Sequence, residues 1–245
     1  MRWTYRRTVA FIPRRSELPH LLNARGLLGE GVELGVQQGL FSAEILSAWK
    51  GARLHLVDPW RAFEATEYVD IANYSQERQD ELHDETVERM QPFGDRAQIH
   101  RAASPEAAQR FADGSLDFVY LDARHDYASV LVDLDAWYPK IRPGGILLGH
   151  DYLDGRYNAT QFGVRSAVST FSATHGLSVW GTYRDRPWVS FVAVVGGAKP
   201  RAIERMAALA TRAVAAVADR RSGERLPPDE SAGRSCAAAS ATRDR

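Results

Sequence analysis

The sequence has a single cysteine, no excess of either charge and no long apolar run, and each scarcity excludes a class of protein. Cys236 alone cannot form a disulfide within the chain. The 31 basic residues balance the 31 acidic ones, so no overall field draws the chain to nucleic acid or to an anionic membrane surface. No apolar stretch approaches the roughly 20 residues that cross a bilayer, and Val9-Ala10-Phe11-Ile12 is too short for the core of a secretion signal. We therefore expect a cytoplasmic protein that acts on a small molecule.

The 245 residues, 44% of them hydrophobic, are enough for one domain with extensions. We expect an N-terminal lead-in over residues 1–29, one domain over 30–220 and a disordered tail over 221–245. The tail is rich in Gly, Pro, Ser, Ala and charge, a composition that buries too little apolar surface to offset the entropy of ordering. An alanine-rich stretch, 202–220, is predicted to be helical.

Short apolar runs alternate with helical patterns along the chain, which predicts an α/β protein with a doubly wound parallel sheet. The expected strands lie at about residues 31–35, 53–57, 98–102, 116–121 and 145–149. Two later runs, 177–182 and 188–194, flank Arg-Asp-Arg-Pro and are predicted to form a hairpin.

The first strand ends in a glycine-rich turn that starts a helix, within the run Gly31-Val-Glu-Leu-Gly-Val-Gln-Gln-Gly-Leu-Phe-Ser42. The second strand ends on Asp58, at the spacing expected when an acid binds the ribose of a nucleotide-like cofactor. The turn offers Gly35-x-x-x-Gly39 after Glu33, and it lacks the third glycine of a dinucleotide-binding motif. A carboxylate there would repel a pyrophosphate but favour a cationic ligand such as S-adenosylmethionine (SAM).

In these features the chain resembles the class I SAM-dependent methyltransferases. The resemblance implies a Rossmann-like, seven-stranded sheet with an antiparallel strand near the C-terminus. It also implies that the methionine end of the cofactor lies near the glycine turn, the ribose at the second strand and the adenine after the third strand. The corresponding residues are Glu33, Gly35, Gln38, Gly39, Ser42, Asp58 and Ser104, together with Asp122 at the fourth strand. Trp60 is interpreted as a wall of this pocket or as a core residue.

Two neighbouring strand ends carry groups suited to acid–base and metal chemistry. Asp122 and His125 follow the fourth strand, and His150 and Asp151 follow the fifth. Because ligands bind at the carboxyl ends of parallel strands, these side chains are expected to share one crevice. An alternative is that Asp122 only caps the next helix.

The block from Tyr120 to Tyr152, with its Asp-x-x-His and Arg-Pro-Gly-Gly sequences, is similar to metal-dependent O-methyltransferases of sugars and secondary metabolites. These include macrolide-sugar and mycobacterial methylglucose lipopolysaccharide methyltransferases. The resemblance covers about residues 30–155. It implies that Asp122 and Asp151 bind a divalent cation, that His125 is the general base, and that dimers or larger homo-oligomers form.

His150 stands where the sugar-modifying relatives carry glutamate. It is interpreted either as a third metal ligand or as a hydrogen-bond partner of the ligands. The expected cation is Mg or Mn, and a nitrogen donor suits Mn, Fe or Zn better than Mg. The expected reaction is methyl transfer to a hydroxyl of a small molecule such as a sugar, a glycoside or a polysaccharide precursor. A non-sugar natural product as acceptor, a nicotinamide-dependent oxidoreductase and a non-catalytic cofactor-binding module remain alternatives.

Residues 61–96, between the second and third strands, form a long insertion with ten acidic residues. Leu82, Thr86 and Met90 recur at helical spacing, whereas 62–74 has no period and is interpreted as a mobile lid or as a solvated insertion. After the fifth strand, four residues are expected to face the acceptor: Tyr152, Tyr157, Asn158 and Phe162.

Overall fold

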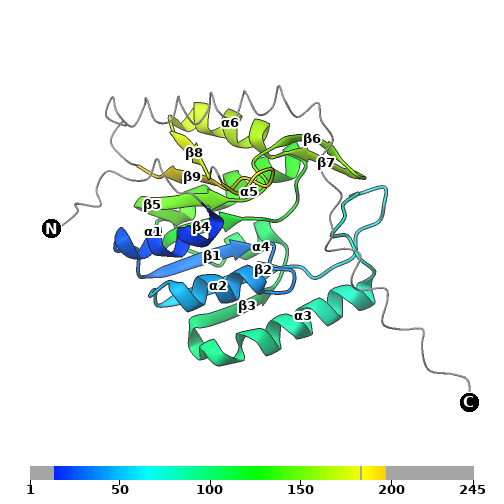
Figure 1. Cartoon of the computed structure of the whole chain (residues 1–245), viewed down its shortest axis with the longest axis horizontal. Coiled ribbons are helices and arrows are strands. Elements are labelled where there is room, and N and C mark those ends of the chain that lie inside the picture. The colour runs from blue at the N-terminus through cyan, green and yellow to red at the C-terminus, as the bar shows by residue number, and fades with distance from the viewer. Residues whose placement is uncertain (1–13, 183, 197–245) are drawn as a thin grey trace, which may run out of the picture.

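The computed structural model describes residues 14–182 and 184–196, and its centre is one seven-stranded sheet with helices on both faces (Figure 1). In chain order the strands of this sheet are β1 (Glu30–Leu34), β2 (Arg53–Asp58), β3 (Ala97–Arg101), β4 (Leu116–Leu121), β5 (Ile141–Gly149), β8 (Val179–Gly181) and β9 (Phe191–Val194). The helices are α1 (Leu18–Ala24), α2 (Leu40–Ala48), α3 (Gln76–Met90), α4 (Ser104–Ala108), α5 (Tyr127–Trp137) and α6 (Val164–His175). Short 3-10 turns lie at Arg15–Glu17, Gln91–Arg96 and Tyr138–Lys140.

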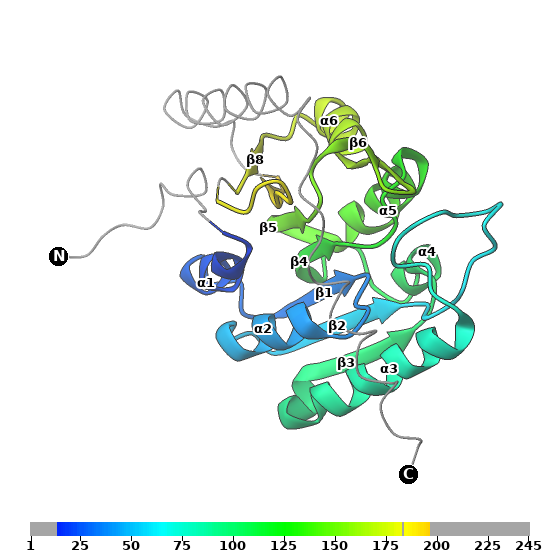
Figure 2. The same cartoon turned by 45° about the vertical axis from the view of Figure 1, so that its right-hand side comes forward.

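The strands are ordered β3-β2-β1-β4-β5-β9-β8 across the sheet (Figure 2). Neighbours from β3 to β5 are parallel, and β9 runs antiparallel to both β5 and β8. This arrangement confirms the doubly wound fold with a late antiparallel strand. The strand order reverses between β1 and β4, and such a reversal opens a crevice at the carboxyl ends of the strands.

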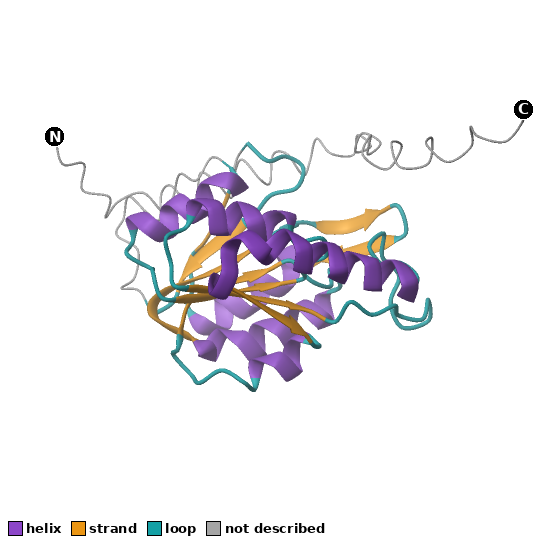
Figure 3. Cartoon of the chain, turned by 90° about the horizontal axis from the view of Figure 1, so that it is seen from below, coloured by secondary structure: helices purple, strands orange, loops and turns teal. Residues whose placement is uncertain are grey.

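Both faces of the sheet are buried, which explains why the central strands are continuously apolar (Figure 3). Alternate residues of β4 face opposite sides. Phe118 and Tyr120 pack in the core under α1, α2 and α3, whereas Val119 and Leu121 pack in the core under α4, α5 and α6. The sheet thus forms a rigid support for the loops at its carboxyl edge.

Two features near the fifth strand differ from the expectation. The strand β5 begins at Ile141 rather than near residue 145, because the Arg-Pro-Gly-Gly segment continues it through a register shift against β4. Gly144 takes a φ of 84° there, which favours glycine. A second hairpin, β6 (Asp154–Tyr157) and β7 (Thr160–Gly163), was not predicted, since its strands are only four residues long.

The predicted helix at 202–220, the tail at 221–245 and most of the first half of the lead-in, residues 1–13, lie outside the described residues. Within residues 14–182 and 184–196, no helix combines the length and apolarity that a membrane crossing requires.

Candidate active site

The carboxyl ends of β1, β4 and β5 meet at one edge of the sheet. The backbone N–H of Asp122 donates to the carbonyl of Leu34 at 2.8 Å, and the N–H of His150 donates to the carbonyl of Leu121 at 2.9 Å. These bonds extend the parallel pairing by one residue and fix the first residue after each strand. Asp122 and His150 therefore start from adjacent points, as the sequence predicted.

Three of the predicted residues converge above this edge. One ligand-type atom from each of Asp122, His125 and Asp151 lies within 4.8 Å of the others. The Nε2 atom of His125 is 3.1 Å from Asp151 Oδ2. Two carboxylates and an imidazole in this arrangement are a donor set that divalent cations accept.

His150 lies beside the same carboxylates. Its Nδ1 is 2.8 Å from Asp151 Oδ1 and 3.8 Å from Asp122 Oδ1. Its position is compatible with either of the two roles considered for it. Asp122 does not cap α5, because the side chain of Asp126 accepts the hydrogen bond from the N–H of Ser129 at that helix end.

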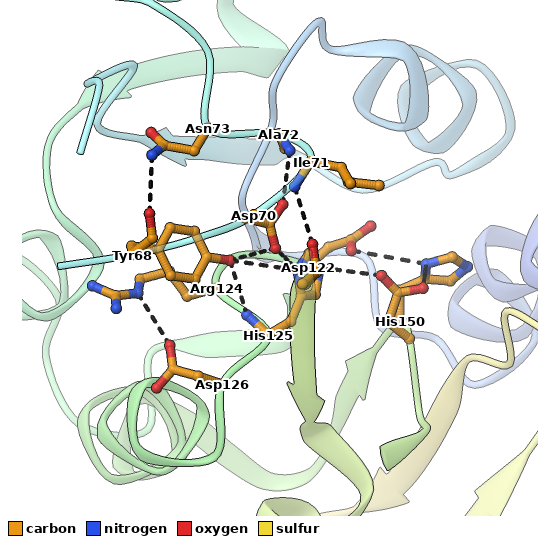
Figure 4. A network of polar contacts seen from close by, with 12 residues as sticks. Tyr68, Asp70, Ile71, Ala72, Asn73, Asp122, Arg124, His125, Asp126 and His150 are labelled. Carbon is orange, nitrogen blue, oxygen red and sulfur yellow. Dashed lines mark hydrogen bonds and ion pairs between the residues drawn. The ribbon is translucent and has the colours of Figure 1, made fainter. Parts of the chain in front are cut away.

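Asp70, which sequence reasoning missed, faces His125 from the other side (Figure 4). Its Oδ2 is 2.7 Å from His125 Nδ1 and accepts a hydrogen bond from the Tyr68 hydroxyl at 2.8 Å. The same hydroxyl accepts from the backbone N–H of His125 at 3.3 Å. Nothing in the sequence distinguishes Asp70 from the other acidic residues of the 61–96 insertion, because its role depends on how an aperiodic segment folds back.

The segment that carries Tyr68 and Asp70 is anchored at several points. The Arg124 guanidinium lies 4.2 Å from the centre of the Tyr68 ring, and the N–H of Ile71 donates to Thr160 Oγ1 of β7 at 3.0 Å. Asn73 holds the carbonyl oxygens of Phe63 and Tyr68 through its side-chain amide. The segment thus covers His125 in this structure, while its proposed movement as a lid stays a prediction.

The two carboxylates control the charge of His125. Burial alone would lower the pKa of this imidazole, but hydrogen bonds to Asp151 and Asp70 outweigh it and raise the pKa to about 10. Burial likewise acts to raise the pKa of Asp151, yet hydrogen bonds from His125 and His150 hold it below its ordinary value. With the protein's own groups alone, His125 is therefore an imidazolium at neutral pH.

The glycine turn after β1 has a backbone that other elements hold in place. Gly35 and Gly39 have φ values of 78° and 69°, and Gln37 between them has a φ of 53°. A Cβ on Gly35 would lie 2.0 Å from the carbonyl oxygen of Asp122, so only glycine fits against β4 there. The carbonyl oxygens of Gln37 and Gln38 accept hydrogen bonds from α3, through Thr86 and Arg89 respectively.

Asp58 supports this turn from the end of β2. Its carboxylate accepts hydrogen bonds from the N–H groups of Val36, Gln37 and Trp60 at 2.9, 3.0 and 2.7 Å. Its contact with a ribose stays a prediction. Trp60 is completely buried and donates from its indole to the carbonyl of Gln37 at 2.8 Å, so it is a core residue and not a wall of the pocket.

Glu33 and Ser42 form a buried pair under the turn. The Ser42 hydroxyl donates to Glu33 Oε2 at 2.5 Å. Ser42 is 0% exposed and Glu33 is 1% exposed. Burial raises the pKa of Glu33 to about 8, although the hydrogen bond from Ser42 opposes this. Because both side chains are shielded from solvent, their direct contact with a cofactor stays a prediction.

Ser104 begins α4, close to the end of β3 where the adenine is expected. Its hydroxyl donates to Asp133 Oδ1 at 2.5 Å and accepts from the Trp137 indole at 2.9 Å. The hydroxyl is thus turned toward α5, and its contact with the cofactor stays a prediction. Asp133 itself is buried and lines a pocket that also includes Asp122, His125 and His150.

Comparison with known proteins finds a family match for about half of the chain. Residues 32–152 match the family model described as a methyltransferase domain. An uncharacterized protein of Sinorhizobium fredii is 24% identical over 173 residues, which cover 67% of this chain but only 18% of that protein. The chain thus corresponds to less than a fifth of the length of this curated relative.

Solved structures share the fold at low identity. A Corynebacterium glutamicum protein has a TM-score of 0.54 and 17% identity, covering 78% of this chain and 85% of its own. TomG of Streptomyces achromogenes, an O-methyltransferase involved in tomaymycin synthesis and solved with SAM, has a TM-score of 0.51 and 16% identity, covering 74% and 79%. An O-methyltransferase of Bacillus cereus, solved with S-adenosylhomocysteine (SAH), has a TM-score of 0.50 and 15% identity, covering 73% of this chain and 79% of its own. Residues 32–152 of this chain therefore match a methyltransferase-domain model, and the chain has a fold that solved O-methyltransferases share.

Proposed function

We propose that this protein is a SAM-dependent O-methyltransferase that acts, with a divalent cation, on a hydroxyl of a carbohydrate or another small molecule. The observation that carries the proposal is the cluster of Asp122, His125 and Asp151 at the ends of β4 and β5, beside the glycine turn of a methyltransferase domain. The O-methyltransferases solved with SAM and SAH that share this fold support the cofactor.

The turn and its surroundings fit a cationic nucleoside. Its backbone is held in a defined conformation by Asp58 and α3 before any ligand binds. The carboxylate of Asp122, whose backbone packs against Gly35 of the turn, favours the ammonium and sulfonium charges of SAM over a pyrophosphate. The sulfonium makes the methyl group electrophilic, so the protein has to supply orientation and a proton acceptor.

The carboxylates of Asp122 and Asp151 would hold the cation. The imidazole of His150 would complete the set if His125 keeps its role as base, and His125 is also placed close enough to serve as a ligand. A divalent cation would lower the pKa of an acceptor hydroxyl and fix its position. A nitrogen donor from either histidine, His125 or His150, favours Mn over Mg.

His125 would take the proton from the acceptor hydroxyl. Asp70 binds Nδ1, which leaves Nε2 as the atom that accepts a proton in the neutral form. In this structure Nε2 pairs with the carboxylate of Asp151, which raises the pKa of the imidazole. Asp151 therefore has to bind another partner before His125 can act as a base near neutral pH. A cation shared by Asp122 and Asp151 meets this requirement.

Aromatic rings next to His125 suit an acceptor with a ring. Phe162 is buried with its ring centre 4.8 Å from that of His125. Trp188 continues the row at 5.8 Å from Phe162, and Tyr157 at 5.1 Å from Trp188. Aromatic faces of this kind pack against the apolar faces of sugars and of aromatic compounds. Asn158, in contrast, lies in the exposed turn of the β6–β7 hairpin.

The test combines binding and turnover. SAH should raise the midpoint temperature of thermal unfolding, and NAD should not. Stabilisation by NAD and not by SAH would favour an oxidoreductase. Methyl transfer to a panel of sugars and glycosides should stop after treatment with EDTA and return with Mn or Mg. Methyl transfer that is unaffected by EDTA would remove the cation from the proposal, and SAH binding without transfer to any hydroxylated acceptor would leave a binding module.

A further inference from the structure

Arg15 places a guanidinium beside the glycine turn, and nothing in the sequence pattern had drawn attention to it. Its Nη2 is 3.2 Å from Asp122 Oδ2, and its guanidinium carbon lies 3.8 Å from the centre of the Phe41 ring in the first turn of α2. Arg15 thus lies between the end of β4 and the start of α2, over the place assigned to the methionine end of the cofactor. This inference rests on the proposed use of SAM.

The local arrangement holds the guanidinium in place. The backbone N–H of Arg15 donates to the carboxylate of Asp185, in the loop that precedes β9. The ring of Tyr120 adds a second aromatic contact at 5.4 Å. Arg15 is thus held through its backbone and through its guanidinium, which suits a residue that stays in the site when a ligand binds.

The guanidinium has donors left for an anion. Its Nε is buried and has no hydrogen-bond partner among the described residues, and a buried donor without a partner is costly. The start of α2, close by, is preceded by Gly39 and is not capped by any side chain. A helix N-terminus with free N–H groups and an arginine fork are two features that attract a carboxylate.

We infer that Arg15 binds the α-carboxylate of the methionine moiety of SAM. The zwitterionic end of the cofactor would then match the charges on the protein: the carboxylate toward Arg15 and the start of α2, and the ammonium toward Asp122. The assignment makes the segment before α1 a part of the cofactor site. This segment lies outside the match to the methyltransferase-domain model, which begins at residue 32.

The experiment compares two ligands by isothermal titration calorimetry: SAH, and the SAH analogue in which hydrogen replaces the α-carboxylate. The wild-type protein should bind SAH more tightly than the analogue. Arg15→Ala should weaken SAH binding at least tenfold and change the affinity for the analogue less than threefold, as expected for the loss of a charge-assisted bond. Arg15→Lys should retain part of the preference for SAH.

Arg14→Ala is the matched control, because Arg14 is the preceding arginine and is exposed; it should leave both affinities unchanged. The ratio of the two affinities within one variant does not depend on how much of that variant is folded, so partial unfolding of Arg15→Ala does not affect the result. If Arg15→Ala lowers the affinities for SAH and for the analogue equally, Arg15 has a structural role and the inference is overturned. Tighter binding of both would show that Arg15 competes with the cofactor, which also overturns it. A wild-type protein that binds neither ligand would instead refute the proposed function.

Discussion

The Nδ1 atom of His125 lies 2.7 Å from Asp70 Oδ2, although 55 positions separate the two residues in the chain. This contact joins the loop after β4 to the 61–96 insertion between β2 and β3. It fixes the ring orientation of the proposed base and decides which nitrogen faces the acceptor side. The pairing resembles the carboxylate–imidazole pairs that orient a base in many hydrolytic enzymes.

Asp70→Asn should lower turnover about tenfold or more, because the amide can no longer stabilise the imidazolium that forms when His125 takes a proton. SAH affinity should stay unchanged, since the hydrogen bonds of Asp70 run to Tyr68, Ala72 and His125 and not to the glycine turn. Steady-state kinetics and calorimetry measure the two quantities. Asp84→Asn, an exposed carboxylate on α3, is the control. Normal turnover in Asp70→Asn would show that the contact only anchors the insertion.

His125→Ala should reduce turnover by at least an order of magnitude while SAH binds as before. His20→Ala, on the exposed side of α1, should have no effect on either quantity and controls for loss of a histidine. If His125→Ala retains most of its turnover, another group accepts the proton and the assignment of the base is wrong.

Asp58→Ala should weaken SAH binding and also lower the free energy of unfolding. The variant leaves three N–H donors without their acceptor, at a cost on the order of 2 kcal/mol or more. Urea unfolding measures the stability and calorimetry measures the affinity. Unchanged stability together with weaker binding would assign Asp58 to the ligand alone.

Asp133→Asn should stabilise the protein at pH 7 but not at pH 4. Burial raises the pKa of Asp133 to about 6, against about 4 in an unfolded chain. Between these values the folded protein binds a proton that the unfolded chain has released, so the free energy of unfolding falls as the pH rises through this window. The asparagine does not titrate. The free energy of unfolding of Asp133→Asn, relative to wild type, should therefore rise by about 1–3 kcal/mol from pH 4 to pH 7.

Urea unfolding at both pH values checks this prediction, with Asp135→Asn on the exposed side of the same helix as control. A difference between wild type and Asp133→Asn that does not change with pH would mean that the pKa of Asp133 is the same in the folded and the unfolded protein.

Local sequence patterns were sufficient to predict the fold and the main positions of the candidate site. Alternating apolar strands and helices specify a sheet buried on both faces, and parallel strands bring their carboxyl ends to one edge, so Asp122, His125 and Asp151 could be placed together from local patterns alone. The glycine turn could be located because Gly35 and Gly39 serve backbone conformations that other residues rarely adopt.

The groups that meet these residues from distant segments depend on long-range packing, which local patterns do not specify. Asp70 and Arg15 belong to stretches with no apolar period, so no local rule fixes where their chains run; that is set by anchors such as Ile71 on Thr160 and Arg15 on Asp185. The same holds for Trp60, whose local position was compatible with a pocket wall or a core residue, and whose indole meets the carbonyl of Gln37 in the packed core. The Ser104 hydroxyl meets Asp133, a partner that sequence spacing does not encode, while its contact with the cofactor stays a prediction.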